Sequence, residues 1–482
     1  MSFLHNVQRW RQKADLAEVG YYQPPPGLDA VFEGRTPLVL GRKGAGKTAL
    51  LNFVEQHYAE RAFFFRLTFN PQLLRGWGRQ SDNANPLTAA DYESLWTAFI
   101  HHEFCRVAVS RGAISGSLKT DISIRHDVPG PGGPAKFLRR LLYGVRSLTI
   151  GFRSFQLTSD GEIQPAQLRE YRNNRDWHEY LAICKADAEA VAAQIGKPCI
   201  ALCDEIDLRI DTQDHMRFND YTNCVRGLLN TAAQLQERHV VSSIIALRSD
   251  IFDAIIGAEL NAWNGRILRV EANEDRIKEL LLTRIRRSLP EQEAKEIASF
   301  DSAWARISVA GYFDFDFIRQ RTLNRPRDYV EYLSLAAKYQ LQNDAGSEKI
   351  AGTAFRGTTL EFAQFLLNEF CDEIYFKYDF GRSIVEALRY LYPPAAQRQN
   401  FTYSEFRRSL GLQGVDLPEQ EMRELVRDLY RMSVLGFQSR HESGLSPMRF
   451  LHQNDAGQLP PVFWQDDIVL VLHRGFRYAL IG

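Results

Sequence analysis

The chain of 482 residues contains no apolar run that approaches the roughly 20 residues needed to span a membrane. Its N-terminus also lacks the apolar core of a secretory signal peptide. We therefore expect a cytoplasmic protein with no membrane contact. Lysine plus arginine balance aspartate plus glutamate at 59 residues each, so any nucleic-acid contact must come from a local basic patch.

Cysteine is scarce, with six scattered residues. Cys199 and Cys203 fall on one face of an expected strand, which indicates core positions. Residues 101–105 (His-His-Glu-Phe-Cys) gather potential metal ligands, but their spacing matches no standard zinc site. We interpret them as polar residues on the surface of a helix.

One motif carries most of the functional information. The apolar residues 37–40 lead into Gly-Arg-Lys-Gly-Ala-Gly-Lys-Thr at 41–48, the spacing of a phosphate-binding P-loop. Its glycines let backbone amides wrap a phosphate chain, and the helix that follows points its N-terminal dipole at the same phosphates. We expect ATP here, with Lys47 on the β- and γ-phosphates and Thr48 on Mg²⁺. The predicted nucleotide-contacting residues are Gly41, Arg42, Lys43, Gly44, Ala45, Gly46, Lys47, Thr48 and Ala49.

A second apolar strand, residues 199–203, ends in Asp204 and Glu205. We expect this strand to lie beside the phosphate loop and Asp204 to hold Mg²⁺ through water. Glu205 can polarise the attacking water as a general base, and the Asp-Glu pair favours ATP hydrolysis over a GTPase-type switch. Asp207 is interpreted as a helix N-cap.

Other residues can also contact the nucleotide. A further buried strand ends at Arg248, whose guanidinium can sense the γ-phosphate or pair with Asp250 instead. Ahead of the P-loop strand, Tyr21, Tyr22 and Val31 can pack on the adenine or simply pack under a loop.

A long insertion separates Lys47 from Asp204, at about residues 105–175. Residues 119–153 carry seven Lys or Arg against two Asp. This basic excess suits a nucleic-acid surface or a solvated face. Arg139 and Arg140 can equally dock a partner protein.

The sequence after residue 271 predicts helices and then a mixed C-terminal region. Asn-Arg-Pro-Arg-Asp at 324–328 opens a helix with Pro326 in its first turn, and an arginine there can reach a nucleotide from a separate lid. Thr402 and Glu405 form a capping box. A second helix (418–434) and short β-like segments follow, the order of a winged helix-turn-helix. Residues 401–482 hold nine Arg against ten acidic residues, so protein docking is at least as well supported as DNA binding.

The order of these motifs resembles one branch of the AAA+-related ATPases, which holds the origin-recognition-type ATPases and the STAND signalling ATPases. More narrowly, it looks like bacterial P-loop ATPases that share Gly-Arg-Lys-Gly-x-Gly-Lys-[Ser/Thr], an Arg-Ser-Asp strand end and an Asn-Arg-Pro-Arg helix. Residues 37–335 carry the resemblance, and the winged-helix likeness at 370–482 is weaker. Bacterial relatives of this type serve in phage defence.

This resemblance implies an α/β protein with a P-loop NTPase core (1–270), a helical lid (271–365) and a winged-helix-like domain (366–482). Arg248 would be a first sensor and Arg327 a second sensor, with Pro326 near the adenine. A homo-oligomer would need an arginine finger, and Arg217, Arg226 and Arg238 lie in the region that could present one, although none stands out.

Three functions compete at this stage. The first is an ATP-driven switch that controls how the lid and winged helix engage a protein partner. The second is a DNA-binding or DNA-loading ATPase that uses the winged helix and residues 119–153. The third, a small-molecule kinase, is disfavoured because no second-substrate lid is recognisable and Glu205 favours water as the acceptor.

Overall fold

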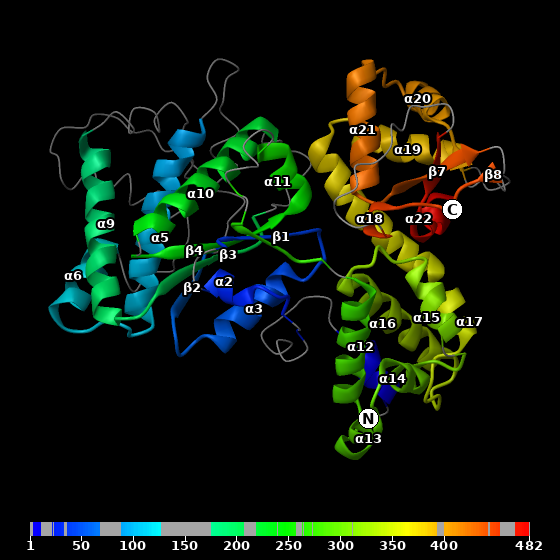
Figure 1. The fold of residues 1–482 in the computed structure, drawn as a ribbon, viewed down its shortest axis with the longest axis horizontal. Helices are drawn as coiled ribbons and strands as arrows, with labels where there is room; N and C mark the ends of the chain where they lie inside the picture. The colour runs from blue at the N-terminus through cyan, green and yellow to red at the C-terminus, as the bar shows by residue number, and fades with distance from the viewer. Residues whose placement is uncertain are drawn as a thin grey trace. The chain divides into compact units, whose positions relative to one another are not determined.

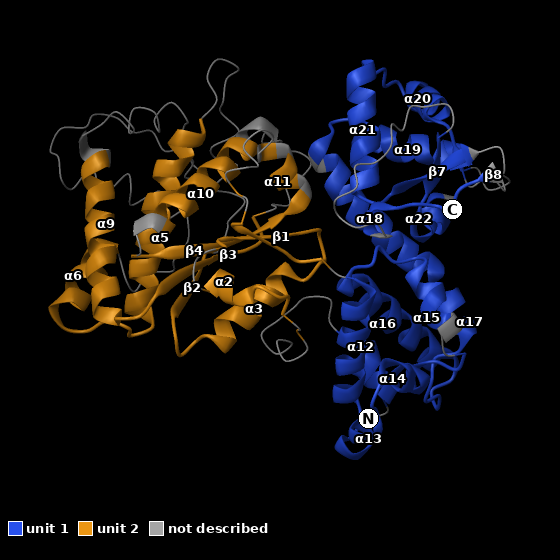
Figure 2. Cartoon of the chain, in the orientation of Figure 1, with its two compact units in different colours: residues 1–14, 272–482 blue, residues 15–271 orange. Residues whose placement is uncertain are grey.

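The computed structural model divides into two compact units (Figure 2), each described here by itself. Unit 2 comprises residues 15–271, and unit 1 comprises residues 1–14 and 272–482. The structure describes residues 3–10, 22, 24–32, 36–67, 88–126, 175–206, 218–238, 240–256, 263, 265–271, 273–310, 312–392, 400–441, 444–453 and 468–481.

Unit 2 is built on a five-stranded sheet whose pairs are all parallel, in the order β2-β3-β4-β1-β5. All five residues of β3 are buried, as expected for a parallel strand that is covered on both faces. The sheet confirms the predicted α/β class. Its strands are β1 (Leu38–Gly41), β2 (Phe63–Leu67), β3 (Cys199–Cys203), β4 (Ser242–Arg248) and β5 (Ile267–Arg269).

The strand order corrects one prediction from the sequence. The strand that precedes Asp204 does not lie directly beside β1, because β4 separates the two. The register sets Gly41 of β1 opposite Arg248 of β4, and Cys203 of β3 opposite Ile245 of β4. The sequence could not decide this order because β3 and β4 are both continuous apolar strands, and either can pair with β1.

Helices cover both faces of the sheet (Figure 1). On one face, Leu50 and Val54 of α3 share a core with Val39 and Leu202 of the sheet, and α2 joins them. On the other face, the ring of Phe104 in α5 lies 5.3 Å from that of Phe65 in β2. The helices of unit 2 are α2 (Leu28–Phe32), α3 (Lys47–His57), α5 (Ala89–Ser110), α6 (Gly116–His126), α9 (Arg175–Ile195), α10 (Phe218–Arg238) and α11 (Ser249–Ile256).

The interpretation of residues 101–105 as surface residues of a helix is wrong. His101 and His102 are each 4% exposed, and Glu103 is 6% exposed. These residues lie in α5, which packs against α6 and α9 in addition to the sheet. Because α9 follows about fifty residues after α6 in the chain, the sequence near α5 does not reveal that this face is covered.

The tightest helix crossing in unit 2 is centred on Gly227 of α10. A Cβ at this position would lie 2.5 Å from Tyr92 Cβ and 2.8 Å from the carbonyl oxygen of Ala89, both in α5. Beside it, the Trp96 indole donates a hydrogen bond to the Cys224 carbonyl at 2.9 Å. The glycine therefore sets how closely α5 and α10 approach.

Unit 1 begins with a bundle of helices. None of the helices in the described ranges of the chain is long and apolar enough to cross a bilayer. The helices are α1 (Phe3–Gln8), α12 (Glu274–Ser288), α13 (Glu291–Glu296), α14 (Phe300–Ile307), α15 (Tyr312–Arg319), α16 (Pro326–Asn343), α17 (Gly352–Gly357), α18 (Thr359–Lys377) and α19 (Gly381–Leu391).

The N-terminal helix α1 packs in unit 1, although the predicted ATPase core of residues 1–270 included it. Leu4 and Val7 are fully buried in the core of unit 1. Asn6 Nδ2 donates to the Ser288 carbonyl, and Trp10 Nε1 donates to Ser288 Oγ, each at 3.0 Å. The chain therefore connects the two units twice, once after α1 and once after residue 271.

The C-terminal part of unit 1 combines helices with a four-stranded sheet in the order β6-β9-β7-β8. The predicted capping box of Thr402 and Glu405 is confirmed at the start of α20. In α21 the predicted inward residues Met422 and Leu425 are fully buried. The elements are β6 (Asn400–Phe401), α20 (Tyr403–Leu412), α21 (Glu419–Arg431), β7 (Leu435–His441), β8 (Gly444–Leu445), η3 (Leu451–Gln453), β9 (Ile468–Leu472) and α22 (Arg474–Ile481).

The close contact at Gly227 yields a test of the fold. Gly227→Ala forces α5 and α10 apart, and we expect it to lower the free energy of unfolding by about 1–3 kcal/mol. Gly411→Ala is the control, because a Cβ at this α20 position meets nothing within 4 Å. Its better helix propensity should stabilise the chain by up to about 1 kcal/mol. Urea denaturation measures both variants, and equal stabilities would contradict the packing described.

Candidate nucleotide-binding site

The predicted phosphate loop leaves the C-terminal end of β1 and enters α3, as the sequence indicated. Gly44 and Gly46 adopt φ values of 79° and 101°, a left-handed conformation that favours glycine. Gly41 is required for another reason, because a Cβ there would lie 2.8 Å from the carbonyl oxygen of Val270. The loop is therefore shaped by backbone conformation at two glycines and by strand packing at the third.

Lys47 is the first residue of α3 and is only 8% exposed. Its Nζ donates hydrogen bonds to the carbonyl oxygens of Gly41 at 3.0 Å and Arg42 at 3.2 Å. The ammonium is thus held across the loop that would surround a phosphate chain. Thr48 and Ala49 follow in the first turn of α3, where free backbone N–H groups and the helix dipole favour an anion.

The rest of the loop is built from Arg42, Lys43, Gly44 and Ala45. Arg42, Lys43 and Gly44 are partly exposed, and Ala45 is buried against the sheet core. The Ala45 amide donates to the Arg42 carbonyl at 3.1 Å, which closes a turn within the loop. Side chains and amides of this stretch are therefore accessible to a ligand at the end of β1.

Arg248 is the last residue of β4 and lies in register with Gly41. Its side chain is 8% exposed. The alternative partner, Asp250, has a side chain outside the described residues. The register places this buried arginine on the strand next to the one that enters the phosphate loop, and a guanidinium can bind phosphate oxygens through two parallel hydrogen bonds.

Asp204 and Glu205 follow β3 at the same C-terminal edge of the sheet. Glu205 has φ of 54°, a conformation that costs a non-glycine residue about 1–3 kcal/mol. The Glu205 amide donates to Asp204 Oδ1 at 2.9 Å, and Tyr221 Oη donates to the Ile206 carbonyl at 3.2 Å. These contacts fix a sharp turn that leaves the Glu205 side chain exposed and Asp204 half-buried. Asp207 lies outside the described residues.

The donor set suits magnesium. Asp204, which follows β3, and Thr48, in the first turn of α3, supply hard oxygen donors, and Mg²⁺ is usually bound by one or two protein oxygens together with substrate phosphates. Within the described ranges, no group of three or more His, Cys, Asp or Glu could hold a metal by itself.

Of the two described candidates for adenine packing, Tyr22 is the one that lies near the loop. Its Cε2 would be 3.7 Å from a Cβ built on Gly46, and its ring lies 5.7 Å from that of Phe53 in α3. Val31 is 1% exposed and belongs to the core under the sheet. Tyr21 lies outside the described residues.

Arg327 and Pro326 belong to unit 1, where they begin α16. Pro326 occupies the first turn, as predicted. Arg327 Nη1 is paired with Glu369 of α18 at 3.0 Å, and its side chain is 27% exposed. Unit 2 therefore brings together the loop, Asp204, Glu205 and Arg248, while these two predicted residues lie on the separate unit.

Arg325, which precedes Pro326 and Arg327 in the chain, stabilises the fold. It is 5% exposed and pairs with the fully buried Asp328 at 2.7 Å. Burial disfavours the charge on Arg325, but the Asp328 carboxylate outweighs it and holds the pKa of the guanidinium above its ordinary value. Asp328 also accepts the Leu323 amide at 2.8 Å, which secures the turn before α16.

Among the arginine-finger candidates, only Arg226 has a described side chain. It donates from Nη2 to the Ile255 carbonyl at 2.5 Å, a contact within unit 2. Arg217 and the side chain of Arg238 lie outside the described residues.

The chain was compared with protein families, solved structures and curated proteins. The family described as FunZ-associated C-terminal helical domain matches residues 275–371, which overlap the predicted lid. A solved structure, the Walker-type ATPase of Pyrococcus abyssi, aligns over 91% of this chain and 96% of its own at 13% identity, with a TM-score of 0.38. Curated proteins give no significant match. Independently of these, the parallel sheet and the loop after β1 agree with the P-loop NTPase fold.

The two arginines that flank Pro326 should differ in their effect on stability. Arg325→Ala leaves the buried Asp328 carboxylate without its ion-pair partner, and we expect a loss of about 3–5 kcal/mol in the free energy of unfolding. Arg327→Ala removes a partly exposed pair and should cost about 1 kcal/mol or less. Denaturant unfolding of the two variants measures the difference. Equal losses would show that Arg327 is as structural as Arg325.

Proposed function

We propose that this chain is an ATP-binding and ATP-hydrolysing switch whose nucleotide state controls the engagement of a protein partner. The observation that carries the proposal is the register of Gly41 with Arg248, which places a buried arginine on the strand next to the one that enters the phosphate loop. The Asp204-Glu205 turn at the same edge of the sheet supports it.

In this proposal, the loop amides and Lys47 bind the phosphates, and Thr48 and Asp204 hold the magnesium ion. The metal neutralises charge on the phosphate oxygens. Glu205 orients the water and accepts its proton, a role that fits an exposed carboxylate on a rigid turn. Arg248 contacts the γ-phosphate from β4. Arg327 and Pro326 would join from unit 1 when ATP is bound, with Arg327 exchanging Glu369 for phosphate.

We assign the C-terminal elements to a winged helix. Support comes from their order, in which α20 and α21 precede the antiparallel pair of β7 and β9. A winged helix that reads DNA places the N-terminal residues of its second helix in the major groove. The charge on α21 therefore indicates which partner it suits.

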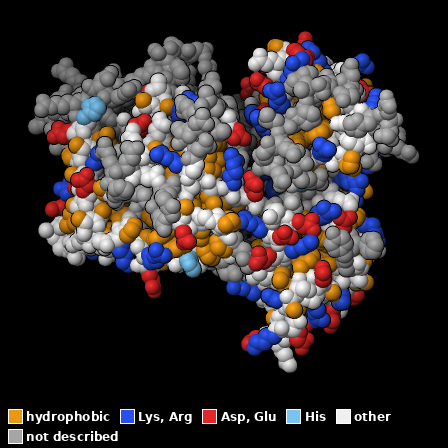
Figure 3. All heavy atoms as spheres, viewed as in Figure 1, with side chains coloured by type: hydrophobic (Ala, Val, Ile, Leu, Met, Phe, Trp, Pro, Cys, Tyr) orange, Lys and Arg blue, Asp and Glu red, His pale blue; other side chains and the backbone are white. Residues whose placement is uncertain are grey.

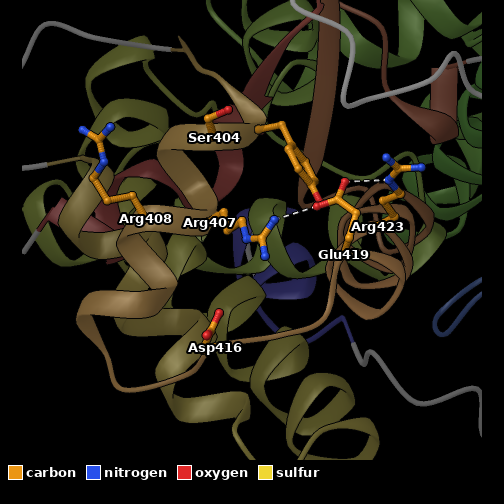
Figure 4. Close-up of a pocket in the computed structure, with 7 residues that line it drawn as sticks. Ser404, Arg407, Arg408, Asp416, Glu419 and Arg423 are labelled. Carbon is orange, nitrogen blue, oxygen red and sulfur yellow. Dashed lines mark hydrogen bonds and ion pairs between the residues drawn. The ribbon is translucent and has the colours of Figure 1, made fainter.

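The surface of α21 is mixed in charge and acidic at its start. Glu419 and Glu421 fall in its first turn, and both would face phosphates in a DNA groove. Arg407 and Arg423 pair with Glu419 at 2.6 and 2.7 Å, so both guanidinium groups are engaged by this carboxylate (Figure 4). The hydrogen bond from Arg423 helps to hold the pKa of the Glu419 carboxyl below its ordinary value.

The surface around α20 and α21 also carries side chains of both charges. A cavity of 530 Å³ between α20 and α21 is lined by three arginines and by Asp416 and Glu419, together with Tyr403 and Ser404. On the face shown in Figure 3, basic and acidic side chains of unit 1 are interspersed. Mixed charge suits a protein partner better than a nucleic-acid backbone.

The DNA alternative depends on the basic stretch at 119–153. Arg125, one of its basic residues, pairs with Asp187 at 2.7 Å and is engaged within unit 2. Arg139 and Arg140 lie outside the described residues. DNA binding through this stretch is therefore the second candidate, to be judged by experiment.

The finer biological assignments rest on resemblance. They comprise membership of the origin-recognition-type and STAND branch of AAA+-related ATPases, a part in phage defence, and self-association. The cytoplasmic location is also part of the proposal, and it comes from the sequence pattern rather than from the resemblance. These assignments go beyond the chemistry of the site.

Hydrolysis tests the chemistry of the proposal. Glu205→Gln should lower steady-state ATP turnover by about 10²–10⁴-fold while ATP binding persists, since the general base is lost but the phosphate contacts remain. Lys47→Ala should lose binding itself. Glu60→Gln, an exposed glutamate outside the site, is the control. Unchanged ATP turnover in Glu205→Gln would show that Glu205 is not the general base. Acceleration of wild-type turnover by duplex DNA would favour the DNA-binding function.

The switch itself is tested by hydrogen exchange. We expect amides at the start of α16 to be better protected with a slowly hydrolysed ATP analogue than with ADP, because Arg327 would bind the γ-phosphate. Arg327→Ala should abolish this difference. Arg306→Ala, which removes an exposed ion pair with Glu293, should preserve it. Identical protection in the two nucleotide states would contradict the switch.

A further inference from the structure

A buried polar cluster joins three helices of unit 2. His102 of α5 and His126 of α6 face each other, with their Nδ1 atoms 2.9 Å apart. His126 Nε2 lies 3.0 Å from Oδ2 of Asp187 in α9. His102, His126 and Asp187 are 4%, 2% and 6% exposed. Arg125 completes the cluster with two bonds to the Asp187 carboxylate, at 2.7 and 2.9 Å.

The hydrogen bonds define where the protons sit. Burial opposes the charge on Asp187, but hydrogen bonds from His126 and Arg125 outweigh it, and the pKa of this carboxyl is lowered. Asp187 is therefore an acceptor, so His126 Nε2 carries a proton. The facing Nδ1 atoms of His126 and His102 then form a hydrogen bond only if a single proton lies between them. Two protonated rings would point N–H against N–H across 2.9 Å.

The two cysteines beside the histidine pair remain protonated thiols near neutral pH. Burial raises the pKa of the Cys105 thiol on α5 and that of Cys184 on α9, the latter to about 12. Glu103 of α5 pairs with Arg106 at 2.7 Å. His101 is bonded to the Thr97 carbonyl within its own helix, at 2.7 Å.

The cluster lies at a junction in the chain. His126 is the last residue of α6, and α9, which carries Asp187, begins at residue 175. Residues 127–174, which include most of the predicted basic insertion, are therefore joined at both ends to helices that this cluster connects. Besides the cluster, α6 is anchored by the fully buried Ile122.

We propose that His102 and His126 form a proton-sensitive clamp that holds α6 on α5 and α9 and so fixes the base of the insertion. With one shared proton the clamp is closed. When both rings become doubly protonated under mild acid, neither Nδ1 atom can accept, so the hydrogen bond between the rings is lost and α6 is released. The clamp concerns the insertion and is independent of the proposed nucleotide chemistry.

Hydrogen exchange of α6, corrected for intrinsic exchange rates, tests the clamp at about pH 7.5 and about pH 5.5, the range in which histidine titrates. We expect α6 amides of the full chain to lose about tenfold of their protection at the lower pH, the effect of one buried hydrogen bond. Amides of β4 serve as the internal reference. Equal α6 protection at both values, relative to β4, would overturn the proposal.

Two variants separate the clamp from general acid sensitivity. His102→Asn keeps a neutral group that can hydrogen-bond to His126 and does not titrate, so the pH dependence of α6 should disappear. His101→Asn alters a buried histidine of the same helix that lies outside the pair. This variant should retain the pH dependence of α6 protection. Persistence of the effect in His102→Asn would contradict the clamp.

A spectroscopic readout does not depend on how the variants fold. Nitrogen NMR of the histidine-labelled wild type reports protonation at Nδ1. The shared proton signal should change over the same pH range in which α6 loses protection. Titration of the pair without any change in α6 would also overturn the proposal.

Discussion

The pairing of β1 between β4 and β5 is the interaction on which the rest of unit 2 depends. Gly41 ends β1 where its backbone approaches the Val270 carbonyl so closely that no side chain fits. The Val270 amide in turn donates to the Leu40 carbonyl, which holds the strand end in place. From this point the loop can turn directly into α3, and the same register brings Arg248 level with Gly41. A displacement of β1 would therefore shift the loop relative to Arg248 of β4.

Pairing of acidic with basic side chains is the second feature that recurs in both units. Lysine plus arginine equal aspartate plus glutamate over the whole chain, and many buried charges have a partner close in space. Arg325 with Asp328, Arg125 with Asp187, and Glu419 between two arginines show the pattern in both units. Within the part of the chain that the structure describes, these pairs engage arginines with carboxylates, which suits a protein partner better than nucleic acid. Lys47 donates hydrogen bonds to two carbonyl oxygens of the loop.

Local signals in the sequence predicted local structure well. The P-loop, the Asp204-Glu205 strand end, the Thr402 capping box and Pro326 in a first helical turn all depend on neighbouring residues, and the structure places each in the expected element. Long-range arrangement was not predictable in the same way. The position of β4 between β1 and β3 follows from a choice among similar apolar strands, and the docking of α1 on Ser288 joins residues that lie more than 270 positions apart. Residues 101–105 were misread because the helices that cover them are distant in sequence.

Binding of Mg²⁺–ATP measured by calorimetry tests the central claim most directly, namely that the edge formed by β1, β4 and β3 is a nucleotide site. The account predicts that the wild-type chain binds ATP more tightly with Mg²⁺ than without it. It also predicts that Asp204→Asn loses most of this difference while it still binds metal-free ATP, because only the metal contact is removed. Absence of ATP binding by the wild type, or a magnesium dependence that is unchanged in Asp204→Asn, would contradict the account.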